Sequence, residues 1–185
     1  AAEECVVALV GPAYSGASRV SLPIYEAAML PIITPSATNP TLWDFGKTVF
    51  HRAVLTDDYQ GPALARLVTS RVKNAKVFLV NDATDYSVGL AKTVDITLAG
   101  RLVGKDTTPQ GTTDFTATIA KIKKAKATAV IYTGYFSQAS VFVKQLRDSG
   151  SKAVFAAGDG VLDAQFIKLA RKAAEGVLLS APAIP

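Results

Sequence analysis

The sequence predicts an α/β protein in which parallel sheets are flanked by helices. Two observations lead to this prediction. Short apolar runs rich in β-branched residues alternate with longer segments whose apolar residues recur at helical spacing. Most of the apolar runs end in turns marked by glycine, proline, asparagine or aspartate. Strands that alternate with helices of this length form βαβ units with right-handed crossovers, and therefore parallel sheets.

The first part of the chain is predicted to fold as strand, helix, strand, helical turn and strand. The predicted strands are Val6–Val10, Pro31–Ile33 and Lys47–Leu55, and the predicted helix is Val20–Leu30. The residues spaced along one face of this helix are Leu22, Ile24, Tyr25 and Ala28. Asn39 can cap the helical turn. We expect Trp43 and Phe45 of that turn to pack on the sheet.

The second part continues the alternation through to Ser180. Its predicted helices are Tyr59–Val72, Tyr86–Ala99, Phe115–Lys124, Ser137–Ser149 and Leu162–Ala173. Its predicted strands are Lys76–Val80, Leu102–Thr108, Ala127–Tyr132, Ala153–Ala157 and Val177–Ser180. Asp57 and Asp58 are expected to cap the first of these helices, and Gly150 to end the fourth.

Composition excludes several classes of protein. About half of the residues are hydrophobic (49%) and 19% are charged, so the chain can bury a core. No apolar run approaches the ~20 residues that a membrane span needs. The net charge is +5, but the basic residues are scattered. The one cluster, at 121–126, alternates with small and apolar residues like a solvated helix face, so we expect no nucleic-acid partner.

The residues needed for common catalytic and metal sites are missing from the sequence. Cys5 is the only cysteine and His51 the only histidine, which excludes an internal disulfide, a thiolate pair and a histidine-rich metal site. We expect His51 to be a structural or surface residue of a strand. SGAS lacks the spacing of a nucleophile elbow, and GPAYSG lacks the lysine of a phosphate-binding loop. We therefore expect no catalytic residue, metal or cofactor, and an α/β enzyme is the least supported alternative.

Two polar segments follow the first two predicted strands, where ligands bind in open α/β sheets. The segment AYSGAS carries Tyr14 and Ser15, and TPSAT carries Ser36 and Thr38. A helix that starts after Gly16 would add free N–H groups. Hydroxyl groups beside a helix N-terminus suit a carboxylate.

Three further side chains follow strands of the second part. Tyr86 comes after KVFLV, Tyr135 after AVIY and Asp159 after AVFAA, so all three are expected at one edge of a second sheet. A carboxylate with phenol partners suits an ammonium group. A zwitterion held between the two halves would satisfy both, which is the logic of binding and not of catalysis.

The chain resembles the periplasmic solute-binding proteins of branched-chain amino acid ABC transporters, the leucine/isoleucine/valine-binding protein family. The matching stretches include YSGAS, IYEAAMLPIITPSATNP, FHRAVLTDDYQGPALA, NDATDYSVGLAK, GTTDFTATIAKIKKAKATAVIYTGY and FAAGDGV with AEGVLL. They cover nearly the whole chain in the family's order. The resemblance implies Rossmann-like lobes of a type I periplasmic binding fold, with an amino acid bound in the cleft between two lobes.

The resemblance also implies roles for single residues. Ser15, Ser36 and Thr38 match the group that holds the ligand α-carboxylate in the family. Tyr135 and Asp159 fall where the α-ammonium is held.

The resemblance also concerns the end of the site that holds the ligand side chain, and this sequence differs from the family pattern at two positions. Tyr86 matches a residue that lines the side-chain end. Asp159 replaces the glutamate common in leucine-type binders, and a carboxylate one methylene shorter moves the anchor for the ligand. Tyr14 stands where some members have a disulfide cysteine, which implies that this bridge is absent and that the pocket is narrower.

Family members have two lobes and longer chains, so the resemblance implies a truncated chain whose first lobe is incomplete. We expect a partial first lobe over 1–55 (a βαβ unit plus one strand), a second lobe over 56–181, and the start of a crossing back over 182–185. Leu55, Thr56, Asp57 and Asp58 are the expected hinge. A small sheet under one helix leaves apolar surface, so self-association is expected. A monodisperse monomer in sedimentation would contradict it.

The resemblance further implies a membrane permease as partner and a periplasmic or cell-surface-anchored location. No basic segment followed by an apolar one marks a signal peptide at the start of this chain. The alternative functions are a ligand-sensing regulator with this fold, or a binder of aromatic or other carboxylic acids. A ligand without an amine would leave Asp159 without its partner.

Overall fold

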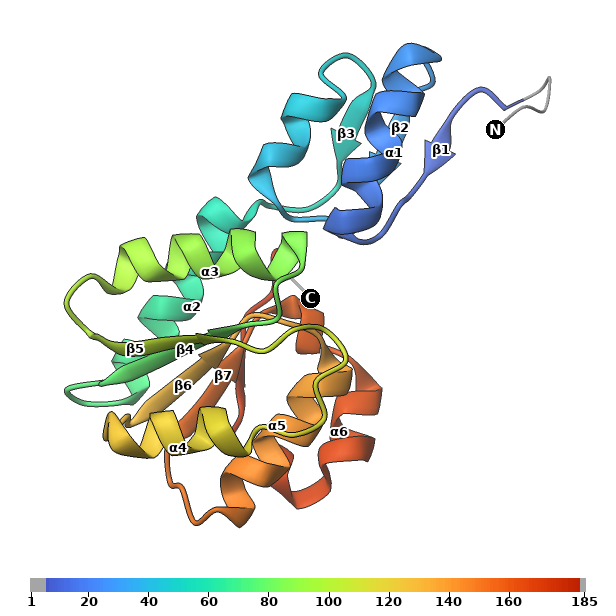
Figure 1. Ribbon diagram of the computed structural model, residues 1–185. Coiled ribbons are helices and arrows are strands. Elements are labelled where there is room, and N and C mark those ends of the chain that lie inside the picture. Colours follow the sequence, from blue (N-terminus) through green and yellow to red (C-terminus); the bar gives the residue numbers. More distant parts are fainter. Residues whose placement is uncertain (1–5, 184–185) are drawn as a thin grey trace.

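The structure is a computed structural model that describes residues 6–183 (Figure 1). It contains a three-stranded sheet in the order β1-β2-β3 and a five-stranded sheet in the order β5-β4-β6-β7-β8. Every neighbouring pair of strands is parallel, which confirms the predicted fold class. Cys5 and the last two residues of the segment 182–185 lie outside the described residues. We call the first sheet with its helices the first lobe, and the second sheet with its helices the second lobe.

The first lobe places two helices over one small sheet. Its elements are β1 (Leu9–Val10), α1 (Ser15–Ala27), β2 (Ile32–Thr34), the 3₁₀ helix η1 (Pro40–Phe45) and β3 (Phe50–Arg52). Its core consists of Leu22, Ile32, Ala37, Leu42, Val49 and Phe50. Burial of these side chains fixes α1 and η1 against the sheet and positions the loops at its carboxyl edge.

The first lobe differs from the sequence prediction at the start of its helix and at two exposed side chains. Helix α1 begins at Ser15, not Val20, because the small residues of SGAS form its first turn and bury Ser15 and Ser18. Strands β1 and β3 are shorter than predicted, and β2 has the predicted length but lies one residue later. Ile24 is 67% exposed and Trp43 is 54% exposed, so neither packs on the sheet. Spacing alone places a residue on a helix but does not show which side another element covers.

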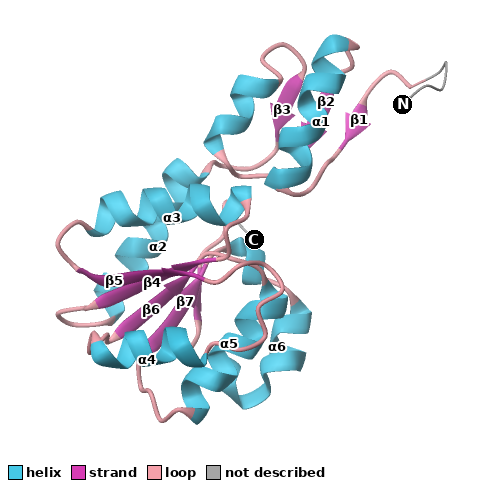
Figure 2. Cartoon of the chain, viewed as in Figure 1, coloured by secondary structure: helices cyan, strands magenta, loops and turns pink. Residues whose placement is uncertain are grey.

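The second lobe is a regular alternation of strands and helices (Figure 2). Its elements are α2 (Asp57–Arg71), β4 (Val77–Asn81), α3 (Asp85–Leu98), β5 (Leu102–Thr107), α4 (Thr116–Lys124), β6 (Ala129–Tyr132), α5 (Phe136–Asp148), β7 (Val154–Ala157), η2 (Asp159–Val161), α6 (Ala164–Ala170), η3 (Arg171–Ala174) and β8 (Leu178–Leu179). Thr56, not an aspartate, is the N-cap of α2, and Asp57 and Asp58 lie in its first turn. Gly150 follows the end of α5 with φ = 79°, as predicted.

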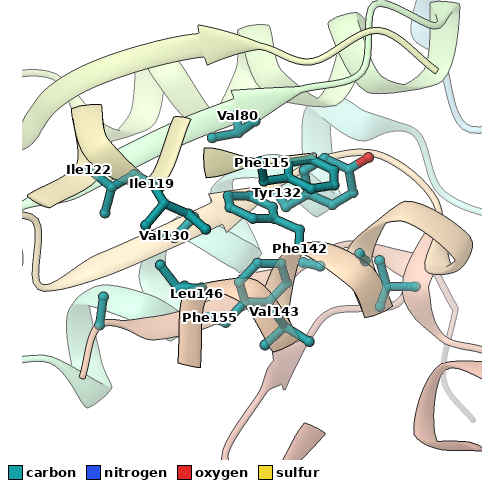
Figure 3. Packing of buried hydrophobic residues seen from close by; sticks show 14 of the residues in the cluster. Val80, Phe115, Ile119, Ile122, Val130, Tyr132, Phe142, Val143, Leu146 and Phe155 are labelled. Carbon is teal, nitrogen blue, oxygen red and sulfur yellow. The ribbon is translucent and has the colours of Figure 1, made fainter. Parts of the chain in front are cut away.

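The second sheet is buried on both faces, and its strands divide their side chains between two cores. In β4, Val77 and Leu79 belong to the core under α2 and α3. Phe78 and Val80 belong to the core under α4, α5 and α6 (Figure 3). This alternation follows from the two-residue period of a strand. A sheet held on both faces is a rigid base for the loops at its carboxyl edge.

Several apolar side chains of the first lobe remain exposed. Val10 is 79% exposed, Val20 is 71% exposed and Ile24 is 67% exposed. The expected self-association stays a prediction, and these side chains are where it would occur. Among residues 6–183, no helix is both long and apolar enough to cross a membrane.

The aromatic cluster of the second lobe yields a stability prediction. Phe142 is fully buried, and its ring stacks on Phe115 with centroids 4.5 Å apart and meets Phe155 edge-to-face at 5.4 Å. We expect Phe142→Ala to lower the free energy of unfolding by about 3–5 kcal/mol, because it leaves a cavity in a packed core. Urea unfolding measures this change. Ile96→Ala, at a site 67% exposed on α3, is the control and should cost much less.

Candidate functional site

Three side chains of the second lobe meet at the carboxyl edge of its sheet. Tyr86 lies in the first turn of α3, Tyr135 is the N-cap of α5 and Asp159 begins η2. The Tyr86 hydroxyl donates a hydrogen bond to Asp159 Oδ1 at 2.9 Å and accepts one from the N–H of Gly160 at 3.1 Å. The ring centroids of Tyr86 and Tyr135 are 5.2 Å apart. Their predicted convergence is confirmed, while their role in binding stays a prediction.

The first lobe presents two hydroxyl groups at the carboxyl ends of its strands. Ser15 is the first residue of α1, and its Oγ accepts a hydrogen bond from the N–H of Asn39 at 3.3 Å. Ser36 lies in the loop after β2 and donates to the carbonyl of Ala13 at 2.7 Å. Both lie beside the N-terminus of a 13-residue helix. The helix dipole makes this end favourable for a negatively charged group.

A cavity of about 180 Å³ lies between the two lobes. Its lining contains six of the seven residues predicted to bind a ligand: Tyr14, Ser15, Ser36, Tyr86, Tyr135 and Asp159. The structure adds Ala13, Phe136, Gly160, Leu162 and Asp163. The added residues are sequence neighbours of predicted ones. The sequence did not identify Phe136 and Leu162, because an apolar residue near the start of a helical segment is as typical of a buried core as of a ligand cavity.

Thr38 is the one predicted residue that does not line this cavity. Its side chain is fully buried, and Oγ1 has no hydrogen-bond partner among residues 6–183. The carbonyl of Thr38 accepts a hydrogen bond from the N–H of Asp57 at 3.0 Å. The backbone of Thr38 is thus tied to the start of α2, and the expected role of its hydroxyl in ligand binding stays a prediction.

Polar and aromatic contacts join the two lobes around the cavity. Arg19 of α1 forms an ion pair with Asp85 of α3, with Nε 2.8 Å from Oδ1. The side-chain amide of Asn39 donates to the carbonyl of Asp85 at 2.6 Å. The rings of Tyr14 and Tyr135 meet edge-to-face across the cleft, with centroids 5.6 Å apart. The sequence offered no signal for Arg19 or Asn39 as inter-lobe contacts, since their partners are distant in the chain.

The predicted hinge residues lie where the chain passes from the first lobe to the second. The N–H of Leu55 donates to the carbonyl of Pro182 at 3.0 Å, so two crossing segments run side by side. Thr56 caps α2, and Asp57 and Asp58 follow in its first turn, where their charge is favourable to the helix dipole. Movement at this hinge stays a prediction.

Burial determines the electrostatics of the Tyr86–Asp159 pair. It raises the pKa of Asp159 above the ordinary value, while hydrogen bonds from Gln60 and Tyr86 lower it. Burial also raises the pKa of Tyr86, and the neighbouring Asp159 carboxylate raises it further. Tyr86 therefore stays a neutral donor. Asp159 forms no ion pair within the part of the chain that the structure describes, so its carboxylate is poised to accept a cation.

Asp57 is a second buried carboxylate close to the site. It is fully buried, and neither carboxylate oxygen has a hydrogen-bond partner among the described residues. Burial raises its pKa from 3.8 to about 7, Thr38 and Arg52 oppose this, and Asp159 adds to it. The guanidinium of Arg52 instead donates to the carbonyls of Thr38 and Asn39, at 2.7 and 2.9 Å.

The cavity brings together groups that suit the binding of a small charged ligand. Within residues 6–183, no three histidine, cysteine, aspartate or glutamate side chains are grouped so that they could hold a metal ion. The cavity joins hydroxyls and a helix N-terminus on one wall to a carboxylate and phenols on the other. This arrangement suits a small ligand that carries both charges.

Comparison with known proteins agrees with this geometry. The family model described as periplasmic binding protein matches residues 1–185. The leucine-specific-binding protein of Salmonella typhimurium is 32% identical over 177 residues, which are 94% of this chain and 48% of that protein. The chain therefore spans about half the length of the curated relatives it matches.

Solved structures show the same relation. A leucine binding protein LivK from Thermotoga maritima superposes with a TM-score of 0.88 at 29% identity, covering 96% of this chain and 51% of its own. The branched-chain amino acid transporter substrate binding protein LivJ from Streptococcus pneumoniae, solved in complex with isoleucine, has a TM-score of 0.84 at 30% identity. That match covers 94% of this chain and 50% of the other.

The buried Asp57 makes the stability of the chain depend on pH. Its folded pKa is about 7 and its ordinary value is 3.8, so its contribution to stability is full below pH 4 and is lost as the pH rises through 7. Asn mimics the protonated form. We expect Asp57→Asn to match the original chain at pH 4 and to exceed its free energy of unfolding at pH 8, by about 2–4 kcal/mol.

Urea unfolding across this pH range measures the difference. Asp44→Asn is the control variant, because this aspartate is exposed on η1 and is not among the groups that shift the Asp57 pKa. It should show no such pH dependence. A constant difference between the Asp57→Asn variant and the original chain from pH 4 to pH 8 would show that Asp57 is not perturbed.

Proposed function

The chain belongs to the periplasmic binding protein family, and we propose that it is the solute-binding component of an ABC importer for a branched-chain or similar amino acid. The ligand would lie in the cavity between the lobes, with its two charged groups on opposite walls. Two of the matched proteins are named for leucine binding, and a third was solved with isoleucine. Transport is therefore a better candidate than chemical conversion for this cavity.

The first lobe would hold the ligand carboxylate. Ser15 and Ser36 line the cavity, and Ser15 lies in the first turn of α1, whose free N–H groups favour an anion. Thr38 would add a third hydroxyl to this group, since its Oγ1 has no hydrogen-bond partner among the described residues. Its carbonyl accepts hydrogen bonds from Asp57 and Arg52, which would hold the loop that carries Ser36.

The second lobe would hold the ligand ammonium, and Asp159 is the observation that carries the proposal. Its carboxylate lines the cavity, accepts a hydrogen bond from Tyr86, and has no ion-pair partner among the described residues. A buried carboxylate without a cation is unfavourable, and a bound ammonium removes that cost. Tyr135 would cover the ligand from the side, since its ring packs against Tyr86.

The remaining parts of the proposal follow from the same family. The lobes, over 1–55 and 56–181, would close on the ligand about the crossings at Leu55–Asp58 and 182–185. The partner would be the membrane permease of the importer, and the location periplasmic or on the cell surface. A ligand-sensing role would use the same cavity, and only the identity of the partner would distinguish it.

A binder of aromatic or other carboxylic acids is the second candidate, because four aromatic side chains line the cavity. The two candidates differ in whether the ligand needs an amine. Leucine and 4-methylpentanoate share a carboxylate and a side chain, and only leucine carries the ammonium group.

Calorimetry with these two ligands tests the ammonium assignment. We expect the original chain to bind leucine more tightly than 4-methylpentanoate. Asp159→Asn should weaken leucine binding by about 2–5 kcal/mol, since it removes the partner of a desolvated charge. The same change should leave 4-methylpentanoate binding nearly unaffected.

Asp44→Asn is the control, because this aspartate is exposed on η1 and does not line the cavity. Equal losses for both ligands in Asp159→Asn would point to a structural role for the carboxylate. Preference of the original chain for 4-methylpentanoate would favour the carboxylic-acid binder.

A further inference from the structure

A second cavity adjoins the proposed binding cavity and has no role so far. Its volume is about 370 Å³, twice the 180 Å³ of the inner cavity. The two cavities share Tyr14, Tyr135 and Phe136. The outer cavity is otherwise lined by small and polar residues, namely Gly16, Ala17, Thr84, Gln110 and Ser137. The shared aromatic side chains therefore form the partition between the two spaces.

The two tyrosines of this partition are held very differently. Tyr135 packs against Tyr86 with centroids 5.2 Å apart, and a Cβ at Gly160 would lie only 3.2 Å from its ring. Tyr14 is 61% exposed and meets Tyr135 edge-to-face. A single edge-to-face contact is a weak restraint on a side chain that already faces solvent. Tyr14 can therefore turn away, while Tyr135 stays in place.

We propose that the outer cavity is a side-chain compartment for aromatic amino acids, and that Tyr14 determines whether a ligand side chain reaches it. This inference rests on the proposed function, because it places the charged end of the ligand in the inner cavity. With Tyr14 in its present position, the inner cavity accepts a compact amino acid. With Tyr14 turned outward, the ring of a larger amino acid extends past Tyr135 into the outer cavity.

The lining favours an aromatic occupant over a long charged chain. Tyr135 and Phe136 give the lining an aromatic side, and the small residues Gly16 and Ala17 leave room for a flat ring. The hydroxyl of Ser137 and the amide of Gln110 are neutral partners for a polar ring edge, such as the indole N–H. The hydroxyl of Thr84 is already used, since it donates to Asp82 and accepts from the N–H of Ser87. Among residues 6–183, no lysine, arginine, aspartate or glutamate lines the outer cavity.

Calorimetry with leucine and tryptophan on a set of variants tests this inference. We expect Tyr14→Ala to raise the affinity for tryptophan relative to leucine by about tenfold or more, because it opens the partition. Ala17→Leu fills the outer cavity and should cancel this gain when added to Tyr14→Ala. Tyr14→Phe keeps the ring and should show no gain. Tyr59→Ala removes a tyrosine of α2 that is 65% exposed and serves as the surface control.

Indole alone separates failure of this inference from failure of the proposed function. Indole needs neither the carboxylate-holding nor the ammonium-holding groups, so NMR titration of Tyr14→Ala reports on the compartment by itself. Shifts of the Gly16, Ala17 and Ser137 amides, lost on adding Ala17→Leu, would support the compartment even if no amino acid binds. The inference is overturned if indole moves none of these amides, or if leucine binds and the tryptophan-to-leucine ratio is the same with and without Tyr14.

Discussion

The arrangement of the site depends on one constraint, which is that parallel strands deliver their following loops to the same edge of the sheet. Both sheets of this chain are parallel throughout. Ser15 and Ser36 therefore lie at one edge, and Tyr86, Tyr135 and Asp159 lie at another. The contacts of Arg19 and Asn39 with Asp85 bring the two edges face to face. The cavity exists because two such edges oppose one another.

The buried carboxylates between the two lobes have few hydrogen-bond donors and no ion-pair partner among the described residues. Asp159 has Tyr86 as a donor, while the carboxylate oxygens of Asp57 have no hydrogen-bond partner among the described residues. Arg52 uses its donors on backbone carbonyls. Uncompensated buried carboxylates reduce stability and are retained where they serve another purpose. In the proposed function that purpose is attraction of a ligand ammonium to Asp159. Asp57 lies behind the wall, where it makes the junction sensitive to pH.

Much of the fold and of the site follows from local pattern. The alternation of β-branched runs with helical spacing predicted the parallel sheets, and position after a strand predicted six of the residues that line the cavity. Two kinds of error remained. SGAS was left outside the predicted helix Val20–Leu30, since serine and glycine favour turns, although in the structure these residues form the first turn of α1. Trp43 was expected to pack on the sheet and is 54% exposed, because local pattern does not show which side of a helical turn another element covers.

The sequence by itself determined the fold class, the edge at which a ligand would bind and the chemical character of each wall. These properties depend on residue type and on period along the chain, which are local. Tertiary structure alone decided which side chains are buried without partners, as with Asp57, and which meet across the lobes, as with Tyr14 and Tyr135. It also decided that the cleft holds two cavities divided by aromatic rings. Such properties arise from contacts between segments far apart in the chain, and no local pattern encodes them.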